Sequence, residues 1–223
     1  MSVHADIVGR QGHPVQRLIL NVGADYQFAA GQYLNVRGRG MDIPLSIASS
    51  PTRLPELELH YRSTPGVPEA AEMDHLLEGA HLELSAAAGS VRCAATDKPL
   101  LLIAGGSGAA QAFSCAEYRA TLPAAETFVL WCADQAEDLY DTERLAALVD
   151  GHLQICIDDR RTPQNEGLVW LLEHAGEHQA SNVILCGSPG FVYTVTDLLL
   201  AQGFARASLQ SDVYDYAPRT EDA

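Results

Sequence analysis

The sequence is poor in basic residues. Lysine and arginine total 14, whereas aspartate and glutamate total 29, which gives a formal net charge of −15 at pH 7. A surface with this balance repels the phosphates of nucleic acids and of anionic lipids. We therefore expect neither a nucleic-acid partner nor a membrane partner.

Long hydrophobic segments are also lacking. The longest apolar runs, such as the one that ends at Ala104, are far shorter than the about 20 residues that a membrane-spanning helix needs. Residues 1–6 have neither the basic nor the apolar region of a secretion signal. The location expected from these features is the cytoplasm.

The five cysteines stand far apart, and no CxxC pair occurs. This spacing argues against a zinc site and against an iron–sulfur cluster in this chain. The eight histidines show no metal-ligand spacing and are interpreted as surface or strand positions. We expect no metal site, and we expect most of the cysteines to be small buried residues with free thiols.

The chain has enough apolar material for two domains. Its 223 residues, 47% of them hydrophobic, suffice for two domains of about 100 residues each. Residues 1–96 contain short segments of high strand propensity separated by glycine and proline, which is typical of a β-barrel or a β-sandwich. The expected strands are 17–22, 31–36, 57–61 and 81–84, and one helix is expected at 70–77.

The pattern changes near residue 98, where strands and helices begin to alternate. Residues 100–104 form a continuous apolar run, as in a strand that is buried on both faces of a sheet. The alternation over residues 97–223 predicts an α/β domain with a doubly wound parallel sheet. Further strands are expected at 127–132, 153–157, 182–187 and 207–213, and helices at 110–122, 141–149, 168–177 and 191–202.

Two glycine-rich turns follow strands of this second domain. The turn Gly105–Gly108 comes after the first strand, and the segment Cys186–Gly190 comes after the fourth. Such turns let a ligand approach the backbone closely, and ligands of α/β sheets bind beyond the carboxyl ends of the strands. Gly105–Gly108 fits neither the GxGxxG pattern nor the phosphate loop, so a simple strand–helix connector remains an alternative, as does a buried core thiol for Cys186.

A serine stands among apolar residues in the first domain. Ser46 lies in the segment Ile43–Ser49, which follows the predicted strand that contains Tyr33. Its hydroxyl could form a hydrogen bond with a planar heterocycle while Tyr33 and Leu45 pack beside it. The alternative from the residues alone is an ordinary strand in which the serine is satisfied by the protein.

Four short segments, taken in order, resemble the ferredoxin–NADP reductase superfamily. They are Ala30–Tyr33, Pro44–Ser46, Gly105–Gly108 and Cys186–Pro189, and the segment Leu139–Asp141 also matches. The similarity is greatest to the NAD(P)H:flavin reductase-like branch, which has no iron–sulfur domain. The resemblance implies an N-terminal antiparallel six-stranded β-barrel at 1–96 that binds flavin, and a nucleotide-binding α/β domain at 97–223.

The resemblance also implies a function and a set of site residues. The protein would transfer hydride from NADH or NADPH to a flavin, either FAD, FMN or riboflavin, and deliver reduced flavin or electrons to a partner. Ser46 would be the catalytic residue, placed near flavin N5. The flavin would lie against Tyr33, Pro44, Leu45 and Ser46, and the nucleotide against Gly105, Gly106, Ser107, Gly108, Cys186, Gly187, Ser188 and Pro189.

One departure from the family pattern concerns Ile43, which stands where an arginine usually helps to hold the phosphate-bearing tail of the flavin. The change implies weak flavin binding, use of flavin as a diffusible substrate, or loss of activity. Arg37 and Arg39 could substitute, or could be solvated charges of a hairpin. Acidic residues such as Asp134, with no Arg or Lys nearby, favour NADH.

The C-terminal region differs as well, because no aromatic residue ends the chain on the flavin. Tyr214 and Tyr216 could cover it, or they could belong to a frayed acidic tail. Two alternative functions stay open: the reductase component of an oxygenase whose iron–sulfur part is on another chain, and a non-catalytic subunit that keeps the fold. In each enzymatic case the partners are a small-molecule flavin, a nucleotide and an electron-acceptor protein.

Overall fold

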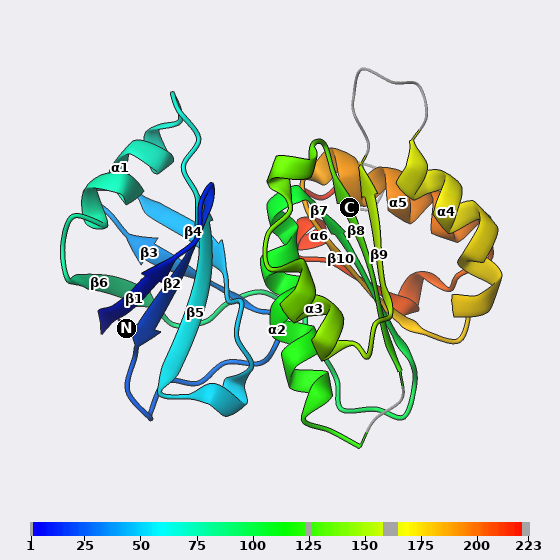
Figure 1. Cartoon of the computed structure of the whole chain (residues 1–223), viewed down its shortest axis with the longest axis horizontal. Helices are drawn as coiled ribbons and strands as arrows, with labels where there is room; N and C mark the ends of the chain where they lie inside the picture. Colours follow the sequence, from blue (N-terminus) through cyan, green and yellow to red (C-terminus); the bar gives the residue numbers. More distant parts are fainter. Residues whose placement is uncertain (1, 124–125, 158–164, 220–223) are drawn as a thin grey trace.

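The computed structural model describes residues 2–123, 126–157 and 165–219. These residues form two β-sheets of different kinds, and each sheet belongs to a separate lobe of the molecule (Figure 1). Six antiparallel strands make the first sheet, and five parallel strands make the second. In the described part of the chain, no helix has the length and apolar character that crossing a membrane requires.

The first sheet closes into a barrel, as the resemblance implied. Its strand order is β4-β3-β6-β1-β2-β5, and a bridge between Ile47 and Leu59 joins its two edges. The first strand, β1, was not predicted. The four strands that were predicted in this domain lie within a few residues of their expected places. The elements are β1 (Ser2–Gln11), β2 (Val15–Asn21), β3 (Tyr33–Arg37), β4 (Asp42–Ser46), the short 3-10 helix η1 (Pro51–Arg53), β5 (Glu56–Arg62), α1 (Pro68–Leu76) and β6 (His81–Ser85).

Strand β5 shows how the barrel fills its interior. Side chains alternate across a strand, so Leu57, Leu59 and Tyr61 point into the barrel core. The intervening residues Glu58 and His60 therefore point outward. Both are nevertheless buried, because the second domain covers this face of β5.

The second sheet has the strand order β11-β10-β7-β8-β9. All its pairs are parallel, which confirms the predicted doubly wound α/β architecture. The strands are β7 (Leu100–Gly105), β8 (Thr127–Ala133), β9 (Leu153–Ile157), β10 (Asn182–Cys186) and β11 (Leu209–Gln210). The helices are α2 (Ala109–Ala120), α3 (Thr142–Leu148), α4 (Glu166–His174), α5 (Pro189–Ala201) and α6 (Val213–Tyr216).

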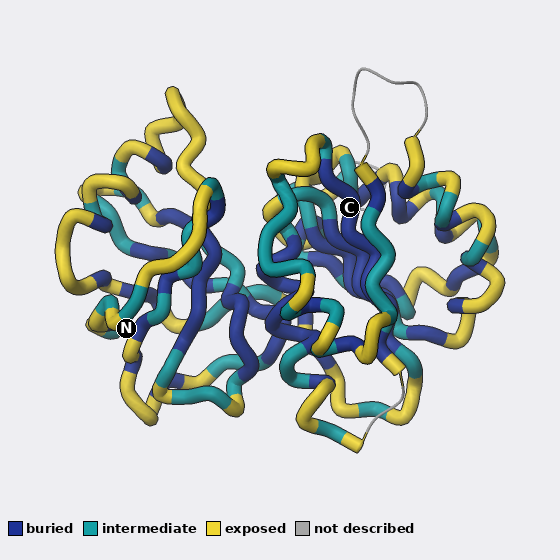
Figure 2. Tube along the Cα trace, viewed as in Figure 1, coloured by how far each residue is buried: buried dark blue, intermediate teal, exposed yellow. Residues whose placement is uncertain are grey.

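The helices cover both faces of this sheet. Helices α2 and α3 pack on the face nearer the barrel, where Phe113 and Trp131 are fully buried, and α4 and α5 pack on the other face. Figure 2 shows the strands as a buried layer between exposed helix surfaces. All five cysteines are buried and none forms a disulfide, as expected.

The last predicted strand, at 207–213, is too long. The observed strand β11 spans two residues, and the chain then turns into the short helix α6. Strand β11 is an edge strand that pairs only with β10, so few ladder hydrogen bonds favour a longer strand. Helix α6 instead buries Val213 in the apolar core of the domain. The boundary between residues 96 and 97 stays a prediction.

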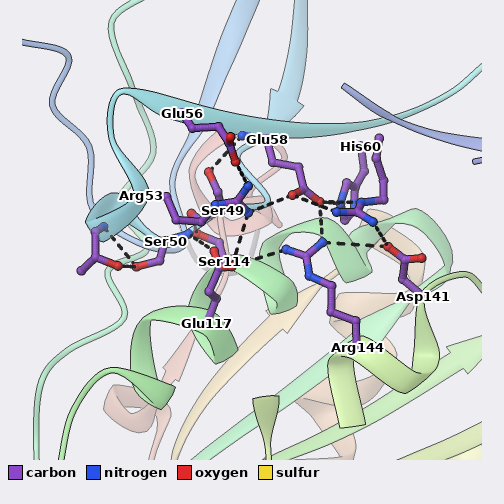
Figure 3. Close-up of polar contacts among 12 residues, drawn as sticks. Ser49, Ser50, Arg53, Glu56, Glu58, His60, Ser114, Glu117, Asp141 and Arg144 are labelled. Atoms are coloured by element: carbon purple, nitrogen blue, oxygen red, sulfur yellow. Dashed lines mark hydrogen bonds and ion pairs between the residues drawn. The ribbon is translucent and has the colours of Figure 1, made fainter. Parts of the chain in front are cut away.

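Helix α2 joins the two domains. The hydroxyl of Ser114 donates a hydrogen bond to the carbonyl oxygen of Ser49 at 2.7 Å. The carboxylate of Glu117 accepts one from the backbone N–H of Ser50 at 2.6 Å (Figure 3). Since both partners lie in the loop after β4, this loop is fixed to the α/β domain.

Candidate functional site

A large cleft of about 1310 Å³ lies between the two domains. This volume exceeds the roughly 300–1,000 Å³ of a typical small-molecule pocket, so the cleft has room for two ligands side by side. Its walls come from both domains and include ten of the twelve residues predicted for the site. These are Tyr33, Pro44, Leu45 and Ser46 on the barrel, and Gly105, Gly106, Ser107, Gly108, Gly187 and Ser188 on the α/β domain.

The other two predicted residues do not line the cleft. Cys186 is 2% exposed and packs in the apolar core, where burial raises the pKa of its thiol. Pro189 is exposed at the start of α5. The structure therefore favours the alternative of a buried core thiol for Cys186, whose place at the end of a buried strand directs its side chain toward α2.

The two glycine turns lie at the point where the sheet changes direction. Strand β7 is flanked by β8 on one side and by β10 on the other, because the chain adds β8 and β9 on one side of β7 and then crosses over to add β10 and β11 on the other. In open α/β sheets, ligands bind at such switch points. The turns also contact each other: a β-carbon at Gly108 would lie 2.6 Å from the carbonyl carbon and oxygen of Cys186. Glycine at 108 is required for this close approach.

Gly106 differs from Gly108 in its surroundings. Its φ angle is +54°, and a β-carbon there would meet no atom within 4 Å. Its carbonyl oxygen accepts a hydrogen bond from the indole N–H of Trp131 at 3.0 Å. The backbone of Gly106 is thus held firmly by the protein while open space lies above its Cα, as close approach of a ligand requires.

Ser46 lies on the opposite wall of the cleft. It is the last residue of β4 and pairs with Tyr33 of β3. Across residues 2–123, 126–157 and 165–219, its hydroxyl forms no hydrogen bond with the protein. The alternative of a serine satisfied by the protein is therefore not supported, and the hydroxyl is available to a ligand.

The charged residues that line the cleft are mostly acidic. The described lining residues include one arginine, Arg62, which forms an ion pair with Asp138. The acidic ones are Asp42, Glu69, Asp134, Asp138 and Asp212. A wall of this kind offers little to a ligand phosphate.

The residue that replaces the family arginine belongs to the barrel core. Ile43 is 4% exposed and packs among apolar side chains. Arg37 pairs with Asp42 at 3.3 Å on the β3–β4 hairpin, and neither Arg37 nor Arg39 lines the cleft. The interpretation of these two arginines as solvated hairpin charges is favoured.

Comparison with known proteins agrees with this architecture, although no protein-family model matches the sequence. The chain is 34% identical over 146 residues to an NAD(P)H-flavin reductase of Vibrio harveyi, a match that covers 60% of each protein. It is 26% identical over 215 residues to the reductase component, a ferredoxin–NAD(P)(+) reductase, of the naphthalene 1,2-dioxygenase system of Pseudomonas putida, covering 91% of this chain and 65% of that protein. The chain thus spans less than two thirds of the length of each of these relatives.

The structure aligns with the ferredoxin reductase in carbazole 1,9a-dioxygenase, with a TM-score of 0.79 and 18% identity, over 95% of this chain and 69% of that one. The chain has the ferredoxin–NADP reductase fold. The resemblance predicted from four short segments is confirmed, as are the two-domain architecture and its sheet topology.

Sequence reasoning missed an acidic residue in the cleft between the domains. Asp212 lines the cleft and accepts a hydrogen bond from the side-chain amide of Gln111 at 2.9 Å. Burial raises the pKa of this carboxyl group, and the nearby Asp215 acts in the same direction. The position of Asp212 just after β11, at the carboxyl end of a strand, was the available signal.

The two C-terminal tyrosines have different places in the structure. Tyr216 is 61% exposed and lines the cleft. Tyr214 instead packs in the α/β domain, where its hydroxyl lies 2.6 Å from that of Thr196 and its ring lies beneath the guanidinium of Arg206. A frayed tail is therefore wrong for this segment, and only Tyr216 is placed to cover a ligand.

Sequence reasoning also missed a buried charge cluster behind the cleft. Glu58 has a side chain with no exposed surface, and its carboxylate lies within 2.9 Å of Arg17, Arg53 and Arg144 (Figure 3). Burial raises the pKa of this carboxyl group, but the hydrogen bonds from His60 and from the arginines outweigh burial and hold the pKa well below its ordinary range. Glu58 is therefore ionised and acts only as an acceptor.

No described group of three or more histidine, cysteine, aspartate or glutamate residues has a geometry that would hold a metal ion.

Proposed function

We propose that this protein transfers hydride from a reduced nicotinamide nucleotide to a flavin. The observation that carries the proposal is that one cleft is lined by Ser46 and Tyr33 of the barrel together with Gly106 and Ser188 of the α/β domain. A relative named NAD(P)H-flavin reductase supports it. The protein's contribution is to hold the two reacting rings in contact and to exclude water, while the cofactors supply the redox chemistry.

The residues present fit a planar heterocycle on the barrel wall. Tyr33, Pro44 and Leu45 offer apolar surface, and the unpaired hydroxyl of Ser46 is one aimed polar group. Apolar walls with few polar groups are typical of cofactor sites. A bound flavin would supply the atom that accepts hydride. The open space above Gly106 fits the nucleotide on the other wall.

We further propose that the flavin is a diffusible substrate. Ile43 and the acidic lining leave no unpaired cation among the described cleft residues to hold a flavin phosphate. The proposal includes a preference for NADH, since Asp134 lines the cleft and would suit a ribose hydroxyl better than a 2′-phosphate. A cytoplasmic location stays part of the proposal, and five free thiols fit a reducing compartment.

The protein is expected to purify without stoichiometric flavin and to oxidise NADH with riboflavin about as fast as with FMN. Purified protein, NADH and riboflavin, FMN or FAD are mixed, and the decrease in nicotinamide absorbance is followed. The physical reason is that the described cleft residues offer no unpaired cation to bind the flavin phosphate. A preparation that keeps one flavin per chain through dialysis would contradict the substrate proposal. Absence of NADH or NADPH oxidation with all three flavins would contradict the enzymatic proposal and favour a non-catalytic subunit.

Replacing Gly106 by valine tests the nucleotide wall separately. The branched side chain would project into open space above the turn, where the nucleotide is proposed to lie. We expect the Kd for NADH to rise by more than about tenfold, which corresponds to about 1.4 kcal/mol. The measurement is a fluorescence titration of NADH, with circular dichroism as a check of folding.

A matched control for Gly106→Val is Gly40→Val. Gly40 also has positive φ, at +82°, and its β-carbon would also meet no atom within 4 Å, but it does not line the cleft. Both variants introduce similar backbone strain. If both lose stability equally and both bind NADH normally, the turn is only a connector.

A second candidate function is the reductase component of an oxygenase. The match to the naphthalene 1,2-dioxygenase reductase component covers 91% of this chain, and that relative extends beyond the matched region. In this case an electron-acceptor protein would take electrons from the flavin. Adding such an acceptor, for example a [2Fe–2S] protein, to the NADH and flavin mixture would separate the two functions, because a diffusible-flavin enzyme shows no saturable dependence on the acceptor.

A further inference from the structure

The segment Leu139–Asp141 has no role in the cleft as described so far, although it forms part of the family resemblance. The hydroxyl of Tyr140 lies 2.8 Å from Nδ1 of His60, which is on barrel strand β5. The Tyr140 ring packs edge-on against His60, at a centroid distance of 5.1 Å. The contact therefore joins the two domains directly behind the cleft, which His60 also lines.

The direction of the hydrogen bonds follows from the chemistry of the partners. Nε2 of His60 lies 2.7 Å from the ionised carboxylate of Glu58, which can only accept, so Nε2 carries a proton. Burial lowers the pKa of His60, and the positive charges of Arg144 and Arg17 lower it further while Glu58 raises it. The net lowering favours the neutral ring. With Nε2 carrying the proton of the neutral ring, Nδ1 accepts a hydrogen bond from the Tyr140 hydroxyl, which keeps its proton because burial raises its pKa.

Tyr140 is in turn packed against the residue that holds the glycine turn. Its ring lies edge-on to Trp131, with the centroids 5.2 Å apart. The indole N–H of Trp131 donates to the carbonyl oxygen of Gly106 at 3.0 Å. Phe113 fills the space between these rings, at 5.1 Å from His60 and 6.3 Å from Trp131. A continuous series of contacts therefore runs from barrel strand β5 to the turn after β7.

We propose that His60 is a positioning residue that sets the Gly106 turn relative to the barrel wall of the cleft, acting through Tyr140 and Trp131. The inference rests on the proposed function. The two walls belong to different domains, so only contacts between the domains fix their separation. Such contacts matter for hydride transfer because misplacement of reacting groups by about 1 Å can cost on the order of 100-fold in rate.

The charge cluster explains why His60 can serve as a fixed reference point. Glu58 is held by arginines of both domains, Arg17 from β2 and Arg144 from α3. Arg17 also pairs with Asp141, the residue after Tyr140, at 2.8 Å. With its buried carboxylate bonded to His60 and to three partly buried arginines, Glu58 keeps a single position and a single orientation of the His60 ring.

The test is the variant Tyr140→Phe, which removes one hydroxyl and keeps the packing of the ring. We expect hydrogen–deuterium exchange of the backbone amides in 105–110 to become about fivefold faster, since one buried hydrogen bond is lost. We also expect kcat/KM for NADH to fall by about 10- to 100-fold while KM for riboflavin stays unchanged. If the Tyr140 hydroxyl were only structural, its loss would lower thermal stability without affecting the kinetics with NADH more than the kinetics with riboflavin.

The matched control is Tyr26→Phe. Tyr26 is also a buried tyrosine with one hydrogen bond, from its hydroxyl to the carbonyl of Ser85 at 3.0 Å, and it does not line the cleft. It should lose similar thermal stability and leave exchange at 105–110 and both kinetic constants as in the wild type. Equal behaviour of the two tyrosine variants in exchange and in kcat/KM would overturn the proposal.

A double-mutant cycle with His60→Leu checks the route. If Tyr140 acts with His60, adding Tyr140→Phe to His60→Leu should cause no further acceleration of exchange at 105–110. If the two substitutions instead accelerate exchange additively, His60 does not act through Tyr140 and the proposal is overturned. The exchange measurement needs neither flavin nor turnover, so it tests the positioning role even if wild-type protein fails to oxidise NADH, a result that would contradict only the proposed function.

Discussion

Replacing Glu58 by glutamine is expected to lower the free energy of unfolding by about 3–5 kcal/mol, the range found when one partner of a buried ion pair is removed. The carboxylate is fully buried and is the common acceptor of Arg17, Arg53 and Arg144. Glutamine has nearly the same volume, but it leaves three cationic groups without their shared counter-charge. Urea denaturation of wild type and variant, monitored by circular dichroism, measures the difference.

The pH dependence of stability should change in the same variant. The pKa of Glu58 is lowered in the folded protein, so its ionised form contributes stability above the ordinary pKa of about 4.3 and this contribution is lost as the pH falls below it. The slope for one such group is about 1.4 kcal/mol per pH unit. We expect Glu58→Gln to show a shallower loss of stability below pH 4.3 than wild type. His60, whose pKa is also lowered, adds a loss that begins below its ordinary pKa of about 6.5.

Glu56→Gln is the control for this variant. Glu56 pairs with Arg53 at the edge of the same cluster, but 46% of its side chain is exposed. Exposed ion pairs contribute about 0–1 kcal/mol, so this change should have little effect on stability or on its slope with pH. If Glu58→Gln behaved like Glu56→Gln, the cluster would not stabilise the contact between the domains.

The architecture was accessible from the sequence because its signals are local. The run 100–104 is apolar at every position, as a strand covered on both faces must be. The glycines of the turn after it meet two local requirements: close packing against Cys186 at Gly108, and a positive φ, which glycine adopts without strain, at Gly106. Strand β1 carried a signal that was overlooked, since Val3, Ala5 and Ile7 alternate with polar residues and all three belong to or pack against the barrel core.

The charge cluster could not be predicted, because its cause is not local. In the sequence, Glu58 and His60 alternate with apolar residues, which is typical of the solvent face of a strand. Here the second domain covers that face, so two polar residues with an exposed pattern become buried. Asp212 was overlooked for a similar reason. Only the folding of α6 against the sheet turns an acidic C-terminal segment into one wall of the cleft.

Replacing Ser46 by alanine is expected to slow hydride transfer to flavin by roughly 10- to 1000-fold, by analogy with other aimed hydrogen-bond donors. The Ser46 hydroxyl lines the cleft and has no hydrogen-bond partner within the part of the chain that the structure describes. Its removal therefore leaves no protein group unsatisfied, and the melting temperature should stay close to that of wild type. Stopped-flow absorbance of flavin reduction by NADH, together with thermal unfolding, measures both quantities.

Ser85→Ala provides the opposite control. The Ser85 hydroxyl accepts a hydrogen bond from the backbone N–H of Asn35 at 2.9 Å and donates one to the carbonyl of Ala86 at 2.7 Å, and Ser85 itself does not line the cleft. Its loss should lower the free energy of unfolding by about 1–3 kcal/mol, because a buried donor is left without an acceptor, and should not change the rate of flavin reduction. The Ser46 variant would then lose rate without losing stability, and the Ser85 variant would lose stability without losing rate. A Ser46→Ala variant that reduces flavin at the wild-type rate would show that the hydroxyl has no part in the reaction, and the flavin would be held by Tyr33, Pro44 and Leu45 alone.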